Sequence, residues 1–140
     1  MEWQVGKLVR PATGKRILVV EDDELVRTLL SHILSAAGYA VDAVATVDAA
    51  LEHMAAHSYH LVLTDDQLPD GRGVAIADRA SAKGMDAVIV TGYASRLAKD
   101  DVARHEHILK PVTPVELIRT VERHIGGEDA APKPADETSD

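Results

Sequence analysis

The chain has 140 residues, of which 46% are hydrophobic and 27% charged, and its formal net charge is -8 at pH 7. The length and composition predict one globular domain. The negative charge argues against a broad basic surface that would bind nucleic acid. The absence of cysteine excludes disulfides, thiol catalysis and cysteine-based zinc sites. The sequence has no membrane-length apolar run and no signal peptide, so we expect a cytoplasmic protein without membrane insertion, whose partners are proteins or small ligands.

The first half of the chain alternates strand and helix patterns. Residues 1–14 form an N-terminal extension, and a β-branched strand over 16–20 then runs into an acidic turn. Apolar residues at helical spacing from 25 to 34 predict a helix that Gly38 closes. A second strand covers 39–44, and Thr46 caps the next helix.

The second half repeats this alternation from residue 61. A buried-type strand over 61–63 ends at two acids, Asp65 and Asp66, and helix 73–83 follows. Strand 86–90 ends at Thr91, a short helix spans 95–104, and strand 106–109 ends at Lys110. The capping-box spacing from Thr113 predicts a last helix. We expect a domain over 15–126 and a disordered acidic, proline-containing tail over 127–140.

Five strands alternating with helices predict an α/β fold, a three-layer sandwich around a five-stranded parallel sheet. In the flavodoxin-like order 2-1-3-4-5, strands one and three are neighbours, so the residues that follow the strands meet at the carboxyl edge. These are three acids, a hydroxyl and an amine: Glu21, Asp22, Asp65, Thr91 and Lys110.

Clustered carboxylates favour a bound cation, and oxygen ligands suit Mg2+. Lys110 and Thr91 would then contact a phosphoryl group that Asp65 receives as a carboxylate nucleophile. Each residue alone also has an ordinary interpretation: Asp22 as a helix cap, Thr91 as a turn cap and Lys110 as a solvated strand end.

Four motifs occur in one order along residues 15–126: Ile-Leu-Val-Val-Glu-Asp-Asp from 17, Leu-Val-Leu-Thr-Asp-Asp-Gln-Leu-Pro from 61, Val-Ile-Val-Thr-Gly from 88, and Ile-Leu-Lys-Pro from 108. With these motifs the chain resembles the receiver domains of two-component response regulators. The resemblance implies that Glu21 and Asp22 are metal-site acids and that Asp65 is the phosphoacceptor. The spacing to Pro69 selects Asp65 over Asp66.

The resemblance also implies further roles. Thr91 is the switch hydroxyl, Lys110 contacts phosphate, and the backbone carbonyl of Gln67 completes the Mg2+ shell. From their positions two residues past Asp65 and two residues past Thr91, we also expect the side chains of Gln67 and Tyr93 to tune the lifetime of the aspartyl phosphate, Gln67 by orienting a water and the Tyr93 ring by shielding the phosphorus from water. The chain departs from the family at His107 (usually Tyr or Phe), at Val112 (commonly Phe), at Arg72 (often an acid) and in a short segment between Thr91 and Lys110.

We therefore expect a stand-alone phosphorelay switch that takes a phosphoryl group from a histidine kinase or histidine phosphotransfer protein and signals to a downstream protein. It is not an enzyme beyond Mg2+-dependent self-phosphorylation and autodephosphorylation. One alternative is a receiver-like adaptor that works without phosphorylation. Another is a haloacid dehalogenase-type phosphohydrolase, which needs a second acid where Gln67 stands. The histidine pairs 53/57 and 105/107 lack a third ligand for zinc.

Overall fold

A computed structural model of the chain describes residues 12–92 and 104–126. Its elements are β1 (Arg16–Val20), α2 (Glu24–Ala36), β2 (Ala40–Val44), α3 (Val47–Ala56), β3 (Leu61–Asp65), β4 (Gln67–Leu68), β5 (Gly71–Arg72), α4 (Gly73–Ala82), β6 (Asp86–Thr91), β7 (Glu106–Leu109) and α6 (Pro114–Ile125). Residues 1–11 of the predicted N-terminal extension, the whole acidic tail and all but the last residue of the predicted helix 95–104 lie outside the described residues. No described helix has the length and apolar character needed to cross a membrane.

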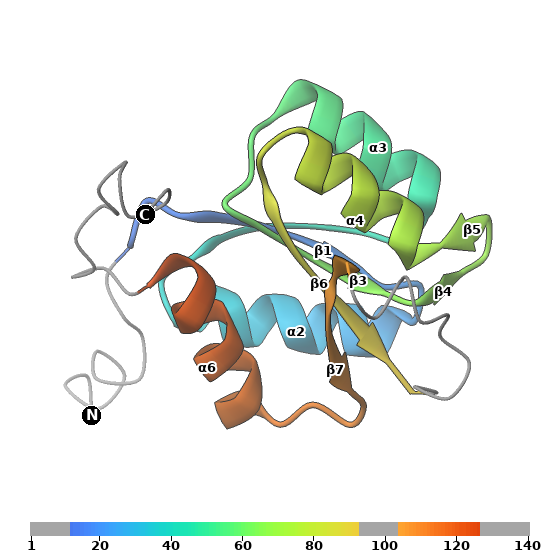
Figure 1. The fold of residues 1–140 in the computed structure, drawn as a ribbon. Coiled ribbons are helices and arrows are strands. Elements are labelled where there is room, and N and C mark those ends of the chain that lie inside the picture. The colour runs from blue at the N-terminus through green and yellow to red at the C-terminus, as the bar shows by residue number, and fades with distance from the viewer. Residues whose placement is uncertain (1–11, 93–103, 127–140) are drawn as a thin grey trace, which may run out of the picture.

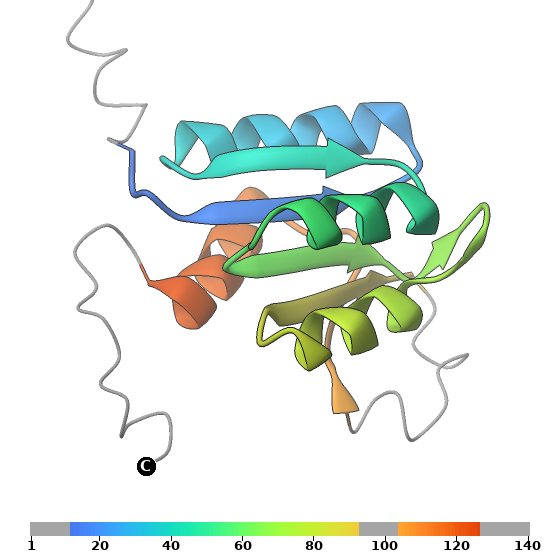
Figure 2. The ribbon, with the colours of Figure 1, turned by 90° about the horizontal axis from the view of Figure 1, so that it is seen from above.

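Five parallel strands form one sheet in the order β2-β1-β3-β6-β7, which confirms the predicted flavodoxin-like order. Helices α3 and α4 cover one face of the sheet, and α2 and α6 cover the other, as Figures 1 and 2 show from two directions. The protein is therefore the three-layer sandwich that the alternation of strand and helix patterns predicted.

The two apolar cores follow from the alternation of side chains along each strand. Leu18, Val20 and Val62 point to the α3–α4 face, whereas Ile17 and Leu63 point to the α2–α6 face. Because β1 and β3 are buried on both sides, neither strand shows the polar alternation of a solvated sheet.

Hydroxyl and carboxylate caps fix where the helices begin. Thr46 Oγ1 accepts a hydrogen bond from the Ala49 amide, and Thr113 Oγ1 accepts one from the Glu116 amide. Both caps were predicted. In α2 the capping residue is Asp23, whose Oδ1 accepts from the Val26 amide at 3.1 Å, so the interpretation of Asp22 as the cap is wrong.

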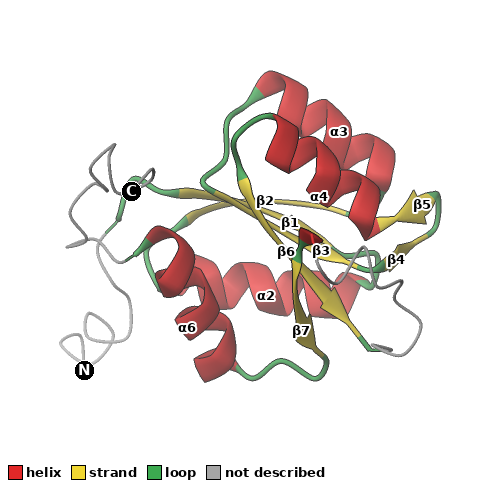
Figure 3. Ribbon diagram, viewed as in Figure 1, coloured by secondary structure: helices red, strands yellow, loops and turns green. Residues whose placement is uncertain are grey.

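A small hairpin that the sequence did not predict lies between β3 and α4. Strands β4 and β5 pair antiparallel, with Gln67 opposite Arg72, and Figure 3 shows them at the edge of the α3–α4 layer. Two-residue strands carry no periodicity, so the sequence predicted only a turn there. After the hairpin the chain passes close under β3, because a Cβ at Gly73 would lie 2.0 Å from the Asp65 carbonyl oxygen.

Candidate functional site

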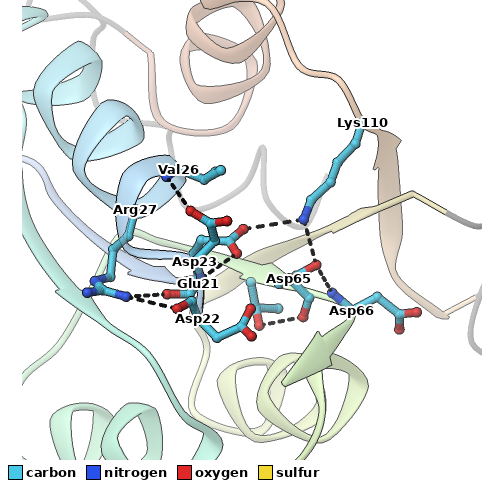
Figure 4. A network of polar contacts seen from close by, with 9 residues as sticks. Glu21, Asp22, Asp23, Val26, Arg27, Asp65, Asp66 and Lys110 are labelled. Carbon is cyan, nitrogen blue, oxygen red and sulfur yellow. Dashed lines mark hydrogen bonds and ion pairs between the residues drawn. The ribbon is translucent and has the colours of Figure 1, made fainter. Parts of the chain in front are cut away.

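The carboxyl ends of four strands bring the predicted side chains to one edge of the sheet. Glu21 follows β1, Asp65 and Thr91 are the last residues of β3 and β6, and Lys110 follows β7. Figure 4 shows the acids and Lys110 pointing toward one another from these separate elements. A cavity of about 430 Å3 opens beside them, lined by Asp65, Asp66, Gln67, Thr91, Gly92 and Lys110.

Three carboxylates form a compact group at this edge. Glu21, Asp22 and Asp65 each offer an oxygen, and these oxygens lie within 4.8 Å of one another. Among the described residues, no other group of three histidine, cysteine or acidic side chains is as close. An all-oxygen set of three carboxylates has the chemistry of an Mg2+ site rather than of a zinc or copper site.

Burial places two of these acids in an unfavourable environment for negative charge. Only 3% of the Glu21 surface is exposed, and burial raises its pKa, with repulsion from Asp65 adding to the effect. Burial likewise raises the pKa of Asp65, although Lys110 and the Asp66 amide act in the opposite direction. A cation at this group would relieve the cost of keeping both side chains ionised.

Lys110 is the positive charge that faces the acids. Its Nζ lies 3.1 Å from Asp65 Oδ1 and 3.4 Å from Glu21 Oε1. Burial opposes its charge, but the carboxylates of Asp65 and Glu21 outweigh burial and raise the pKa of Lys110 above its ordinary value. Lys110 is therefore part of the site and not merely a solvated strand end.

The loop that carries Glu21 and Asp22 is held by two contacts that were not predicted from the sequence. Arg27 Nη1 donates to the backbone carbonyl of Glu21 at 2.9 Å and lies 3.4 Å from that of Asp22. Glu21 Oε2 accepts from the Asp23 amide at 3.0 Å. The spacing of Arg27, five residues after Asp22 and on the first turns of α2, was the available signal.

The two neighbouring acids at the carboxyl end of β3, Asp65 and Asp66, have different surroundings. Asp65 Oδ1 accepts from the Asp66 amide at 2.8 Å and faces Lys110. The Asp66 side chain is only 4% exposed, pairs with Arg72, and points away from the group of acids in Figure 4. Gln67 begins β4 with an exposed side chain and lines the cavity.

Of the remaining side chains considered in the sequence analysis, the structure describes His107, His53 and His57 but not Tyr93. His107 Nδ1 lies 2.9 Å from the His105 carbonyl, and its Nε2 is buried with no hydrogen-bond partner among the described residues. Tyr93 lies outside the described residues. The rings of His53 and His57 are 6.2 Å apart, and the described residues supply no third ligand to make them a metal site.

An apolar groove of about 460 Å3 adjoins the site between α2 and the start of α6. Its apolar lining includes Val26, Leu29, Leu30, Val112 and Leu117, and Asp65 and Lys110 of the candidate site also line it. Leu25 and Leu29 on α2 are 78% and 56% exposed. Exposed apolar surfaces that are larger than scattered single side chains often mark protein-binding faces.

The chain is similar to known proteins over most of its length. A family model described as the response regulator receiver domain matches residues 17–122. The transcriptional regulatory protein DltR of Streptococcus agalactiae serotype III (strain NEM316) is 30% identical over 111 residues, 76% of this chain and 50% of DltR. The response regulator receiver protein CpdR of Brucella abortus (strain 2308) is 34% identical over 114 residues, 78% of this chain and 95% of CpdR. The chain thus spans half the length of DltR.

A solved structure gives a likeness of the same extent. The response regulator protein TrrA of Thermotoga maritima, in complex with Mg2+-BeF, is 28% identical and has a TM-score of 0.71. The similarity covers 78% of this chain and 97% of that one.

Proposed function

The chain belongs to the receiver-domain family of two-component response regulators, and on that premise we propose that it is a phosphorylation switch in which Asp65 accepts the phosphoryl group. Receiver domains act as phosphoacceptor switches rather than as conventional enzymes. The observation that carries this proposal is the Asp65 carboxylate at the end of β3, 3.1 Å from Lys110 Nζ and beside Glu21 and Asp22.

Phosphoryl transfer to Asp65 requires positive charge around an anionic group. Glu21, Asp22 and Asp65 would hold Mg2+ through carboxylate oxygens, and Gln67 through its backbone carbonyl. When bound, the ion supplies charge that offsets the phosphoryl oxygens. The TrrA complex with Mg2+-BeF supports this assignment by analogy. Lys110 supplies the second positive charge from the protein itself.

In the proposed transfer, a carboxylate oxygen of Asp65 attacks the phosphorus of a phosphohistidine in line. The new P–O bond forms as the P–N bond breaks, and the electron pair of that bond returns to the histidine ring. Hydrolysis reverses the state: water attacks the phosphorus, the P–O bond to Asp65 breaks, and phosphate and a proton are released. We propose that Gln67 and Tyr93 set the rate of this hydrolysis by orienting or excluding the water.

The proposed readout of phosphorylation passes through Thr91 and His107. Thr91 is buried at the end of β6, and the β6–β7 register pairs Ile89 with His107 and Thr91 with Leu109. Since side chains alternate along a strand, Thr91 and His107 share one face of the sheet. A phosphoryl group that draws Thr91 inward would leave room for His107 to reorient.

The proposed donor is a histidine kinase or histidine phosphotransfer protein, and the proposed receiver of the signal is another protein. The apolar groove between α2 and α6 supports docking of a donor helix, because it leads to Lys110 and Asp65. Val115, near the start of α6, is a further exposed apolar side chain, with 61% of its surface exposed.

The acceptor is tested with acetyl phosphate and Mg2+, following the intact mass of the protein. Wild type is expected to gain one phosphoryl group, Asp65→Asn none, and the neighbouring Asp66→Asn still one. A chelator should prevent the reaction in wild type. Gain of the group by Asp65→Asn would refute the acceptor assignment, and indifference to chelator would refute the metal role of Glu21 and Asp22.

A further inference from the structure

Asp66 is a buried carboxylate next to the proposed acceptor, yet it belongs to neither the acid group nor the predicted chemistry. Its partner is Arg72 on β5, whose Nη2 lies 2.9 Å and Nε 3.3 Å from Asp66 Oδ1. The Asp66 side chain is 4% exposed and that of Arg72 is 44% exposed. A carboxylate this buried needs a charged partner, and loss of one partner from such a pair is costly.

The backbone of Asp66 is fixed from three directions. Its amide is shared between Asp65 Oδ1 at 2.8 Å and the Val90 carbonyl at 3.0 Å. Its own carbonyl accepts from the Gly73 amide at 2.8 Å. The Asp66 amide is thus bound to β6 and donates directly to the carboxylate of Asp65, while the Asp66 carbonyl is bound to the first residue of α4.

Arg72 closes this arrangement from the hairpin. The β4–β5 register places Arg72 opposite Gln67, and Gly73 lets the chain pass close beneath the Asp65 carbonyl. Arg72 therefore reaches back across the turn to hold Asp66 by its side chain. The ion pair between Asp66 and Arg72 thus joins the two ends of the turn that connects β3 to α4.

We propose that Arg72 is a positioning residue for phosphoryl transfer, which holds Asp66 and thereby fixes the orientation of the Asp65 carboxylate. The Asp66 amide and Lys110 Nζ both engage Asp65 Oδ1, so a shift of the Asp66 peptide would rotate the attacking carboxylate. Displacement of a reacting group by about 1 Å can reduce a rate by roughly a hundredfold. This inference rests on the proposed role of Asp65 as acceptor.

The test compares Arg72→Gln with Arg79→Gln, a matched control that removes the same charge from an exposed position on α4. Initial rates of phosphoryl uptake from acetyl phosphate are measured over a range of donor concentrations in Mg2+, at a temperature where thermal melts show each variant folded. We expect Arg72→Gln to lower the limiting rate by about tenfold, with the half-saturating donor concentration nearly unchanged. Arg79→Gln should match wild type.

Two further variants separate positioning from general stability. Arg72→Lys, which keeps the charge, should recover part of the rate. The double variant Asp66→Asn with Arg72→Gln should lose no more than the more impaired of the two single variants, because both changes break one contact. Amide hydrogen exchange should quicken at Asp66 in Arg72→Gln while remaining slow in the centre of β3.

The measurements distinguish failure of the positioning role of Arg72 from failure of the proposed function. If wild type takes up no phosphoryl group, or takes it up at a residue other than Asp65, the proposed function fails. If wild type is phosphorylated on Asp65 while folded Arg72→Gln has the wild-type rate, or Arg79→Gln is equally slow, the positioning role is wrong. Should Arg72→Gln fail to fold, a wild-type rate in the double variant would overturn the proposal.

Discussion

At the scale of single residues, the site keeps Glu21 and Asp65 buried and close together at a cost in stability. Burial raises the pKa of both carboxyl groups, so ionising them costs more free energy in the folded chain than in the unfolded chain. Asp65→Asn is therefore expected to raise the free energy of unfolding at pH 7 by about 1 kcal/mol, or roughly 4 °C in Tm, without divalent cations.

Mg2+ should reduce this advantage, because an ion that binds only the folded wild type stabilises it by mass action. Thermal melts in chelator and in Mg2+ measure both effects, with Glu52→Gln, an exposed acid on α3, as the control. A less stable Asp65→Asn, or a difference that Mg2+ leaves unchanged, would contradict this account of the acids.

The environment of His107 leads to a second prediction at the scale of single residues. Its Nε2 is buried without a partner among the described residues. If phosphate draws Thr91 inward, reorientation of His107 would take this nitrogen out of its unpartnered position. The affinity for beryllofluoride, measured with Mg2+, should therefore differ severalfold between wild type and His107→Phe. Equal affinities would contradict the coupling.

At the scale of elements, the close passage of α4 beneath β3 depends on Gly73. A Cβ there would lie 2.0 Å from the Asp65 carbonyl oxygen and 3.1 Å from Thr64 Oγ1, so β3 and α4 would have to separate. Gly73→Ala should lower the free energy of unfolding by about 2 kcal/mol or more and slow phosphoryl uptake. Gly92→Ala, which has room for a Cβ, is the control for unfolding by denaturant. Equal effects of the two changes would refute the packing argument.

The edge strand β7 is joined to α6 by a second polar cluster. Arg123 contacts both carboxylate oxygens of Glu106, at 2.6 and 3.0 Å, and His124 Nε2 lies 2.7 Å from Glu106 Oε1. Hydrogen bonds from Arg123, joined by the contact with His124, hold the pKa of Glu106 below its ordinary value of 4.5. The stability from this cluster is therefore present above that value and lost as pH falls through the lowered pKa.

Glu106→Gln should accordingly lower the free energy of unfolding by about 1 kcal/mol at pH 7, and the difference should shrink toward pH 3. Urea titrations of wild type and variant at the two pH values measure this. Glu52→Gln on the opposite face should show no such dependence. A deficit of equal size at both pH values would mean that the charge of Glu106 is not what stabilises β7.

At the scale of the whole molecule, two sets of acids act on stability in opposite directions. Glu21 and Asp65, whose pKa values are raised mainly by burial, bind protons more readily in the folded than in the unfolded chain, so stability rises as pH falls from neutral. The hydrogen bond from Tyr59 lowers the pKa of Asp42, and the hydrogen bonds from Arg123 lower the pKa of Glu106. The contributions of these two carboxylates to stability are therefore lost as the solution becomes more acidic.

Without divalent cations, stability should consequently be greater in mildly acidic solution than at pH 7, and Mg2+ should move the maximum toward neutral pH. A series of thermal melts from pH 3 to pH 8, in chelator and in Mg2+, gives the two profiles. A cation-free protein that is most stable at pH 7 or above would show that the buried acids do not dominate the profile.

The order of the elements and the sheet edge at which the candidate site lies could be predicted from the sequence alone. Apolar runs such as residues 61–63, helix caps such as Thr113 and breakers such as Gly38 are local patterns, and local patterns determine local structure. Once the strands are parallel and in flavodoxin-like order, residues that follow them, such as Lys110, must meet at the carboxyl edge.

Only the tertiary structure decided which side chains pair within that edge. Asp65 faces Lys110 whereas its neighbour Asp66 turns to Arg72, and Asp23 rather than Asp22 caps α2. The periodicity of the sequence likewise did not predict the hairpin that carries Arg72. These choices depend on the direction of a side chain and on partners far away in the chain, such as Lys110 and Glu21 at a separation of 89 residues. Packing fixes that direction, and packing exists only once the distant elements have come together.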